Sequence, residues 1–238
     1  MRNKQNVSMM IFLLLMLWMS ADSIRSQGIA NWFVAELLMI PGIVIGLSFH
    51  EFAHAFASDK LGDPLPKLQG RVTINPMAHI DWTGFLALIF VGFGWGKPVE
   101  INSRNYKRPR RDEFIVAFAG VLMNLVLAIV FTLILKVYLI GFPSAFMAQG
   151  TLVGIIGTMI YNIILINLVL MIFNLIPIPP LDGFNIITQI FDLKKYSWWY
   201  QLYQYGFFIL LALILFNFTG RILTPGVNFF WNILSSIL

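Results

Sequence analysis

Most of this chain lies in long apolar stretches separated by short polar connections, and this alternation restricts its fold more than any other feature. Of the 238 residues, 58% are hydrophobic and 11% are charged. Soluble domains carry about 25% charged residues, so the composition predicts an integral membrane protein. The connections are too short to form a separate soluble domain, and we expect residues 1–238 to form a single membrane-embedded domain.

The first apolar stretch, residues 9–20, follows a basic start that contains Arg2 and Lys4. Its length is that of a signal peptide and small residues follow it, but it lacks a clear cleavage site. Residues 1–28 are therefore either an extra N-terminal helix, spanning or interfacial, or a signal-like segment. We favour an uncleaved helix.

The later apolar stretches predict the fold class. Residues 83–96 are apolar and glycine-rich but too short to cross the ~30 Å hydrocarbon core, which favours a re-entrant segment covered by protein. Alternating residues at 71–74 suggest a little β-structure. The predicted fold is an all-α membrane protein, a bundle of about five to six transmembrane helices with that re-entrant segment and little β-structure. Besides the first stretch, helices are expected at residues 32–58, 113–140, 151–175, 202–217 and 224–238.

Basic residues gather in residues 97–113, which hold six of the sixteen lysines and arginines. Short basic loops of multi-pass proteins face the cytoplasm, so this loop is predicted to be cytoplasmic and the uncharged loop 141–150 external. The net charge of +5 then reflects membrane topology, and no nucleic-acid partner is expected. The same topology places the end of the 32–58 helix and Asp182 at the same depth, on the cytoplasmic side of the membrane.

One segment near that helix end carries catalytic chemistry: His50-Glu51-Phe52-Ala53-His54. Histidines at positions i and i+4 lie on one helical face about 6 Å apart, so both rings can reach one metal ion. Glu51, rotated by about 100° from His50, can meet a water on that ion without ligating the ion. Zinc acidifies such a water, and a glutamate then acts as general base in peptide hydrolysis. Stacked interfacial polar residues are the alternative, but ionisable groups within membrane helices are costly and indicate function.

A catalytic zinc site has three protein ligands and a water, so the two histidines leave one ligand to identify. The chain has no cysteine, and the candidates are Asp182, His79 and Asp81. Asp182 ends the proline-rich run NLIPIPPLD, and Gly183 permits an abrupt turn that directs the carboxylate inward. The alternative is that Asp182 caps a short helix after Gly183.

These features together resemble the site-2 protease family of intramembrane zinc metalloproteases. The resemblance implies that His50, His54 and Asp182 ligate one Zn²⁺ per chain and that Glu51 is the general base. The resemblance extends over about residues 40–190. It is specific, because both motifs occur in the family's order and at the same predicted depth.

The segments between the two motifs are similar to the compact bacterial and archaeal branch of that family, which implies a prokaryotic cell membrane. They are GRVTINPMAHID (70–81), GWGKPVEIN (94–102) and AGVLMN (119–124). The last departs from the family pattern, because Val121 stands where a proline is common.

Four further polar residues receive weaker roles. The resemblance suggests that Asn124 binds substrate backbone or the oxyanion, and interhelical hydrogen bonding is the equal alternative. Asn174 is weighed in the same way, with a preference for shaping the turn around Asp182. His79 is a substrate contact, a support for the ligands, a transient fourth ligand or a plain turn-stabilising histidine. Asp81 is expected to cap the 83–96 segment.

The predicted function is hydrolysis of peptide bonds in or near transmembrane segments of other proteins. The expected partners are a membrane-protein substrate and the lipid bilayer, and a homo-oligomer is compatible with the sequence. The substrate must unwind locally before water can attack it. The re-entrant segment 83–96 and the extended, turn-rich residues 64–80 before it could bind the unwound substrate by strand addition. The rival function is a non-proteolytic metal binder or adaptor, for which an acid between the two histidines has no use.

Overall fold

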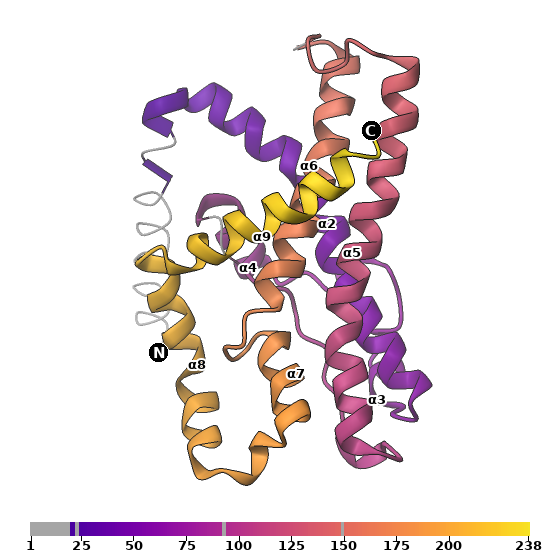
Figure 1. Cartoon of the computed structure of the whole chain (residues 1–238), viewed down its shortest axis with the longest axis vertical. Coiled ribbons are helices and arrows are strands. Elements are labelled where there is room, and N and C mark those ends of the chain that lie inside the picture. Colours follow the sequence, from indigo (N-terminus) through magenta and orange to yellow (C-terminus); the bar gives the residue numbers. More distant parts are fainter. Residues whose placement is uncertain (1–19, 22–23, 92–93, 149) are drawn as a thin grey trace, which may run out of the picture.

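The computed structural model describes residues 20–21, 24–91, 94–148 and 150–238. The segment 9–20 lies outside the described residues except for Ser20, so the nature of the N-terminal segment stays a prediction. The described chain is a helical bundle (Figure 1). Its α-helices are α2 (Ile29–Lys60), α3 (Leu65–Leu68), α4 (Trp82–Val91), α5 (Pro109–Gly141), α6 (Leu152–Asn174), α7 (Asp182–Phe191), α8 (Ser197–Leu215) and α9 (Phe218–Ser235). Its 3₁₀ turns are η1 (Pro76–Ala78), η2 (Ser103–Asn105) and η3 (Leu193–Lys195).

The expected all-α membrane class is confirmed, whereas the number of spans in the described part is smaller than expected. Four of the described helices, α2, α5, α6 and α8, are long and apolar enough to cross a membrane. The prediction of a spanning helix at 224–238 is not supported. The α9 helix that contains these residues runs obliquely across α6 in Figure 1 and carries polar residues such as Arg221 and Asn228.

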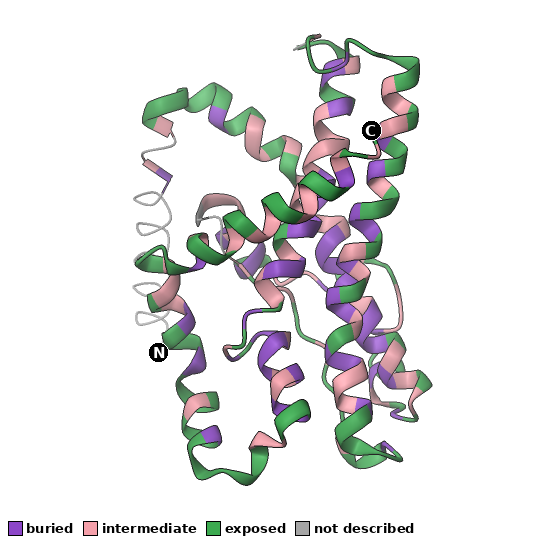
Figure 2. Cartoon of the chain, in the orientation of Figure 1, coloured by how far each residue is buried: buried purple, intermediate pink, exposed green. Residues whose placement is uncertain are grey.

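Helices α2, α5 and α6 pack against one another and form the centre of the bundle. Figure 2 shows the buried residues gathered where these helices meet, while the outward faces of the helices are exposed. Glycines allow the closest approach: a Cβ atom at Gly42 would lie 3.1 Å from the Cα atom of Ile163, and one at Gly46 would lie 2.6 Å from Leu170 Cδ1. Small residues at such contacts are how membrane helices pack tightly without a hydrophobic driving force.

The α4 helix lies in the stretch 83–96 that we expect to be re-entrant. Phe85 of α4 packs with Ile43 and Leu47 of α2, so protein covers one side of this ten-residue helix. Ile80 before α4 and Gly96 after it form an antiparallel bridge, so the chain enters and leaves at the same level. This isolated bridge is the β-structure of the described residues; it lies beside α4 rather than at residues 71–74, where we expected it.

A buried carboxylate joins the loops at the end of α2 to those before α5. Asp63 is fully buried and accepts four hydrogen bonds. The donors are Leu65 N (3.2 Å), Asn102 N (2.7 Å), Asn105 Nδ2 (2.7 Å) and Ser58 Oγ (3.2 Å). Burial alone would raise the pKa of Asp63, but these hydrogen bonds outweigh it and hold the pKa below the ordinary value of 3.8. The loop after α2 and the loop before α5 are therefore held together by an ionised carboxylate.

We predict that Asp63→Asn lowers the free energy of unfolding by about 2–4 kcal/mol at pH 7, because it leaves buried donors without acceptors. The folded-state pKa is lowered, so the stabilisation is complete above the unfolded pKa of 3.8 and is lost as the pH falls through the folded pKa. Chemical unfolding in detergent should show the wild-type advantage shrinking below that pH.

Asp59→Asn, at a neighbouring position outside this hydrogen-bond set, is the matched control and should stay within about 0.5 kcal/mol of wild type. Equal stabilities of wild type and Asp63→Asn at pH 7 would contradict the role given to this carboxylate.

Candidate metal centre

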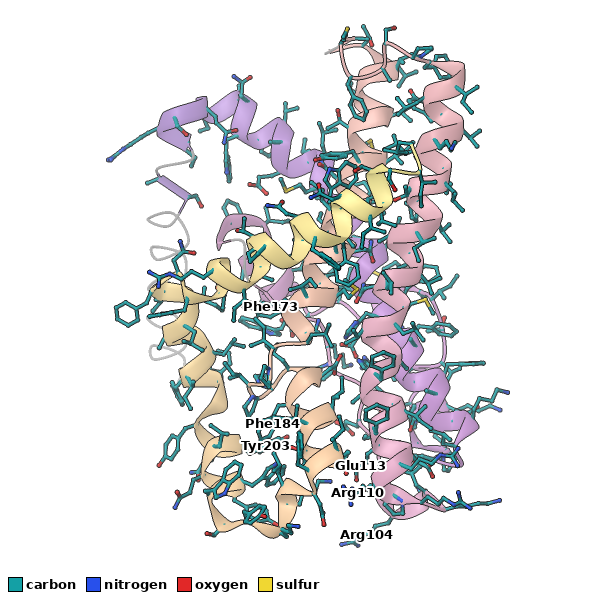
Figure 3. All side chains as sticks on the ribbon, in the orientation of Figure 1. Arg104, Arg110, Glu113, Phe173, Phe184 and Tyr203 are labelled. Carbon is teal, nitrogen blue, oxygen red and sulfur yellow. The ribbon has the colours of Figure 1, made fainter. Side chains whose placement is uncertain are left out.

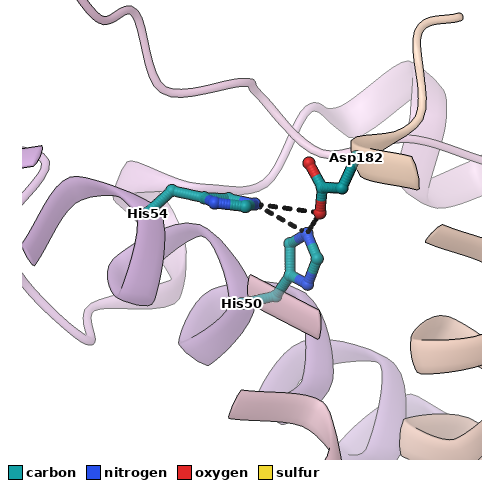
Figure 4. A group of neighbouring side chains, drawn as sticks. All are labelled: His50, His54 and Asp182. Carbon is teal, nitrogen blue, oxygen red and sulfur yellow. Dashed lines mark hydrogen bonds and ion pairs between the residues drawn. The ribbon is translucent and has the colours of Figure 1, made fainter. Parts of the chain in front are cut away.

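The two histidines of α2 face the same point in the bundle. His50 and His54 are 5% and 8% exposed, and their Nε2 atoms lie 3.0 Å apart. Figure 4 shows both rings directed toward a carboxylate from another element, Asp182. Helical spacing alone brings the two rings together, as the sequence predicts.

Asp182 reaches this point from the first turn of α7. Its Oδ2 atom lies 3.2 Å from the Nε2 atoms of both His50 and His54. Helix α6 ends before the proline-rich turn, and Gly183 lets the new helix pack closely, since a Cβ atom there would lie 2.3 Å from Leu175 O. The capping alternative is not supported: α7 begins at Asp182 after Leu181, and no side chain caps it.

Contacts on both sides hold α7 in place and thereby hold Asp182. Figure 3 shows Phe184 and Tyr203 facing each other between α7 and α8, and Arg110 beside the far end of α7. The Phe184 ring stacks on Trp199 at 5.9 Å. The Arg110 guanidinium donates to the carbonyl oxygens of Gln189 and Ile190, each at 2.5 Å. These hydrogen bonds satisfy the free carbonyls at the helix end.

Helix α5 anchors the other nitrogen of each histidine. His54 Nδ1 lies 2.7 Å from Val116 O, and His50 Nδ1 lies 2.7 Å from Asn124 Oδ1. Both partners are oxygen acceptors, so each Nδ1 carries the hydrogen and each Nε2 presents a lone pair. Metal-binding histidines are oriented in the same way, by a hydrogen bond from the nitrogen that does not bind the metal.

Gly120 provides the space in which the two rings meet. It lies midway between Val116 and Asn124 on the same face of α5. A Cβ atom at Gly120 would lie 2.4 Å from His54 Nε2 and 2.6 Å from His50 Cε1. Any side chain here would occupy the region in front of the ligand atoms.

The three residues fit a zinc ion. Their ligand atoms lie within 4.8 Å of one another, and the observed separations are 3.0–3.2 Å. Tetrahedral zinc with bonds of about 2.05 Å needs ligand atoms about 3.3 Å apart. Asp182 Oδ2 is also buried without a hydrogen-bond donor, as expected of an atom whose partner is a cation. Two imidazoles and a carboxylate form a donor set typical of catalytic zinc.

Glu51 lies beside this cluster but outside it. Its Oε2 atom accepts a hydrogen bond from Val99 N at 3.0 Å and lies 4.0 Å from Arg71 Nη2. The segment after α4 therefore supplies one donor to the carboxylate, and Gly96 of the same segment lies against the Glu51 side chain. Glu51 is therefore held beside the three residues without joining them.

Arg71 and His79 hold that segment in position. The Arg71 guanidinium donates to Lys97 O, and Lys97 N donates to His79 O at 2.7 Å. His79 Nε2 donates to Thr73 O at 2.6 Å, so its unprotonated Nδ1 faces Arg71 Nη2 at 3.4 Å. Burial lowers the pKa of His79, and the Arg71 cation lowers it further. His79 is thus a neutral structural residue with both nitrogens engaged, and the transient-ligand alternative is not supported.

The remaining predicted residues lie as follows. Asn124 is fully buried. Its two amide hydrogens are donated to Gly46 O (3.2 Å) and Asn167 Oδ1 (2.9 Å). No amide hydrogen is left for an oxyanion, which favours interhelical hydrogen bonding as the role of Asn124. Asn174 donates to Leu170 O within its own helix and has no hydrogen bond to Asp182. Asp81 accepts from Gly84 N at 2.8 Å, so the expected cap of α4 is confirmed.

Sequence reasoning missed Val116, Gly120 and Arg71. The spacing of Val116, Gly120 and Asn124 would have pointed to one helical face. No local sequence pattern marked Arg71, because its role depends on a contact between separate loops.

Comparison with known proteins adds the following. The peptidase family M50 profile matches residues 38–216. YwhC of Bacillus subtilis, named as a candidate zinc metalloprotease, is 35% identical over 188 residues, which cover 78% of this chain and 84% of YwhC. Rip2 of Mycolicibacterium smegmatis, named in the same way, is 28% identical over 215 residues, which cover 89% of this chain and 75% of Rip2. No solved structure matches the chain significantly.

We predict that Gly120→Ala abolishes zinc retention, because the added methyl group enters the space between the ligand atoms. Metal analysis of the purified protein should fall from about one zinc per chain to near zero. Gly141→Ala, in the same helix with nothing within 4 Å of the new Cβ atom, should retain the metal. Full zinc retention by a folded Gly120→Ala protein would refute the assignment.

Proposed function

The chain belongs to peptidase family M50 and is a metallopeptidase, and from that premise we propose that it cuts peptide bonds in or beside transmembrane segments of other membrane proteins. The observation that carries the proposal is the meeting of His50, His54 and Asp182, from segments far apart in the chain, with Glu51 beside them. Relatives named as zinc metalloproteases support zinc as the metal.

His50 Nε2, His54 Nε2 and Asp182 Oδ2 would hold the zinc, one ion per chain. When bound, the ion supplies a Lewis acid that acidifies water and polarises a carbonyl group. Three protein ligands leave a coordination position free for chemistry, in contrast to a structural site with four.

Glu51 would act as general base on the attacking water. Its carboxylate takes the water proton and can return it to the leaving amine. The Val99 N–H fixes one oxygen of the carboxylate, and the Arg71 cation lies 4.0 Å away. Both contacts fix the position of the Glu51 carboxylate beside the three ligands.

The segment 94–99 would receive the unwound substrate. A helical substrate hides its carbonyl groups in its own hydrogen bonds, so it must be extended before attack. Gly96 of this segment lies against Glu51 and already pairs with Ile80 in an antiparallel bridge, which supports strand addition as the binding mode. A substrate-bound structure without strand pairing at 94–99 would remove this part of the proposal.

We place the site on the cytoplasmic side of a prokaryotic cell membrane. The start of α5, which follows the basic loop, and the turn between α7 and α8, which contains Lys194 and Lys195, lie at one end of the bundle, and the uncharged connection between α5 and α6 lies at the other (Figure 1). The positive-inside rule assigns the basic end to the cytoplasm.

A non-proteolytic metal carrier or adaptor is the rival function. It would account for the three ligands but not for Glu51, whose carboxylate is held beside them without joining them. It would also favour a path of polar groups through the bundle, whereas the α5 and α6 helices around the site are mostly apolar.

We predict that Glu51→Gln retains zinc but lowers cleavage by about 10²–10⁴-fold, because the amide cannot accept the water proton. The test is co-expression with candidate single-span membrane proteins, with cleavage followed by immunoblotting and zinc measured in the purified enzyme. Glu36→Gln, the same change in the same helix but remote from the site, is the control and should cleave like wild type. Cleavage by Glu51→Gln at the wild-type rate would contradict the mechanism.

A further inference from the structure

Asn167 of α6 lies behind the histidine pair, without a contact to any ligand atom, yet it is fully buried. We propose that Asn167 is a positioning residue for the metal centre. Through Asn124 it fixes His50 in the orientation whose Nε2 faces His54 and Asp182. The proposal rests on the metal-binding role given above but needs no peptidase activity.

The chain of hydrogen bonds starts at the main chain of α6. Asn167 Nδ2 donates to Ile163 O at 2.8 Å. A carbonyl oxygen only accepts, so the NH₂ side of the amide must face it. The Asn167 oxygen is thereby directed toward Asn124.

Asn124 then has one permitted orientation. Two acceptors face the same side of its amide, Asn167 Oδ1 at 2.9 Å and Gly46 O at 3.2 Å, so that side must be the NH₂ group. A reversed amide would set its oxygen against two other oxygens. The Asn124 oxygen is left 2.7 Å from His50 Nδ1, which must carry the hydrogen.

The direction of these hydrogen bonds matters because the groups that form them are buried away from water. Asn124 and Asn167 are both fully buried and His50 is 5% exposed. An unpaired polar group in such a place is costly, so no member can reverse alone. The two main-chain carbonyls of Ile163 and Gly46 thus determine which nitrogen of His50 is free to bind metal.

The two histidines differ in how they are anchored. His54 Nδ1 donates to a main-chain oxygen, Val116 O, which side-chain substitution cannot remove. His50 Nδ1 depends on the Asn124 side chain, and Asn124 depends on Asn167. The structure therefore predicts that substitution at Asn167, two hydrogen bonds from His50, weakens the metal site through His50.

Plain interhelical hydrogen bonding is the competing role, and a double-mutant cycle separates the two. Asn167→Leu and Asn124→Leu each should raise the dissociation constant for zinc by about 10–100-fold, the usual effect of losing a partner of a ligating histidine. The double variant should bind zinc like Asn124→Leu alone, since Asn167 acts only through Asn124. The probe is Zn²⁺ itself, measured in detergent against a chromophoric chelator.

Asn162→Leu is the matched control. Asn162 also lies on α6 and donates to a carbonyl of α2, Leu38 O at 3.2 Å, but it has no contact with the site. It should lose stability without losing zinc affinity. Wild-type zinc affinity in a folded Asn167→Leu protein, or losses that multiply in the double variant, would overturn the proposal.

A second measurement uses the unaltered protein and so does not depend on whether the variants fold. The chain has three histidines, which makes ¹⁵N NMR of the histidine-labelled, zinc-loaded protein simple to read. The structure predicts hydrogen on Nδ1 for His50 and His54 and on Nε2 for His79. A His50 ring that carries hydrogen on Nε2, or binds zinc through Nδ1, would overturn the proposal. Neither experiment uses a substrate, so failure of the peptidase assignment would leave both results interpretable.

Discussion

Two hydrogen bonds from α2 to α5, one from the Nδ1 atom of each histidine, determine what the centre of this molecule can bind. They set the protonation of both rings, hold the rings over Gly120 and leave two lone pairs directed at Asp182. Inside an apolar bundle these bonds have no competition from water, so the ligand geometry is preorganised rather than induced by the metal. The close packing of α2, α5 and α6 serves this arrangement.

The two sides of the centre are built differently. Behind the histidines, buried amides and main-chain carbonyls form a connected set of hydrogen bonds. In front of them, the Glu51 carboxylate is held by a loop segment that Arg71 and His79 support. A helical framework on one side of the centre is thus paired with a less regular segment on the other.

Local features of the sequence predicted that His50, His54 and Asp182 would meet, whereas contacts between distant segments were harder to predict. The spacing of His50 and His54 follows from helical geometry, and the prolines before Asp182 mark the break in the helix after which Asp182 approaches them. The partner of Asn124 could not be chosen in advance, because it depends on how three helices pack. Lipid-facing and protein-facing residues are both apolar in this chain, so periodicity reveals neither that packing nor the oblique course of α9. His79 was ambiguous for a related reason, since its pKa is lowered by burial among the folded loops and, to a smaller extent, by Arg71 from a separate turn.

X-ray absorption spectroscopy at the zinc edge of the purified chain tests the central claim most directly. The account predicts one zinc per chain, bound by nitrogen and oxygen at about 2.0–2.1 Å with the scattering signature of two imidazoles. Asp182→Ala should lower the zinc content of the protein. Any zinc that stays bound should show one oxygen neighbour fewer, with the two imidazole contributions unchanged. A spectrum unchanged by Asp182→Ala, or with more or fewer than two imidazoles in the wild type, would contradict the three-ligand centre.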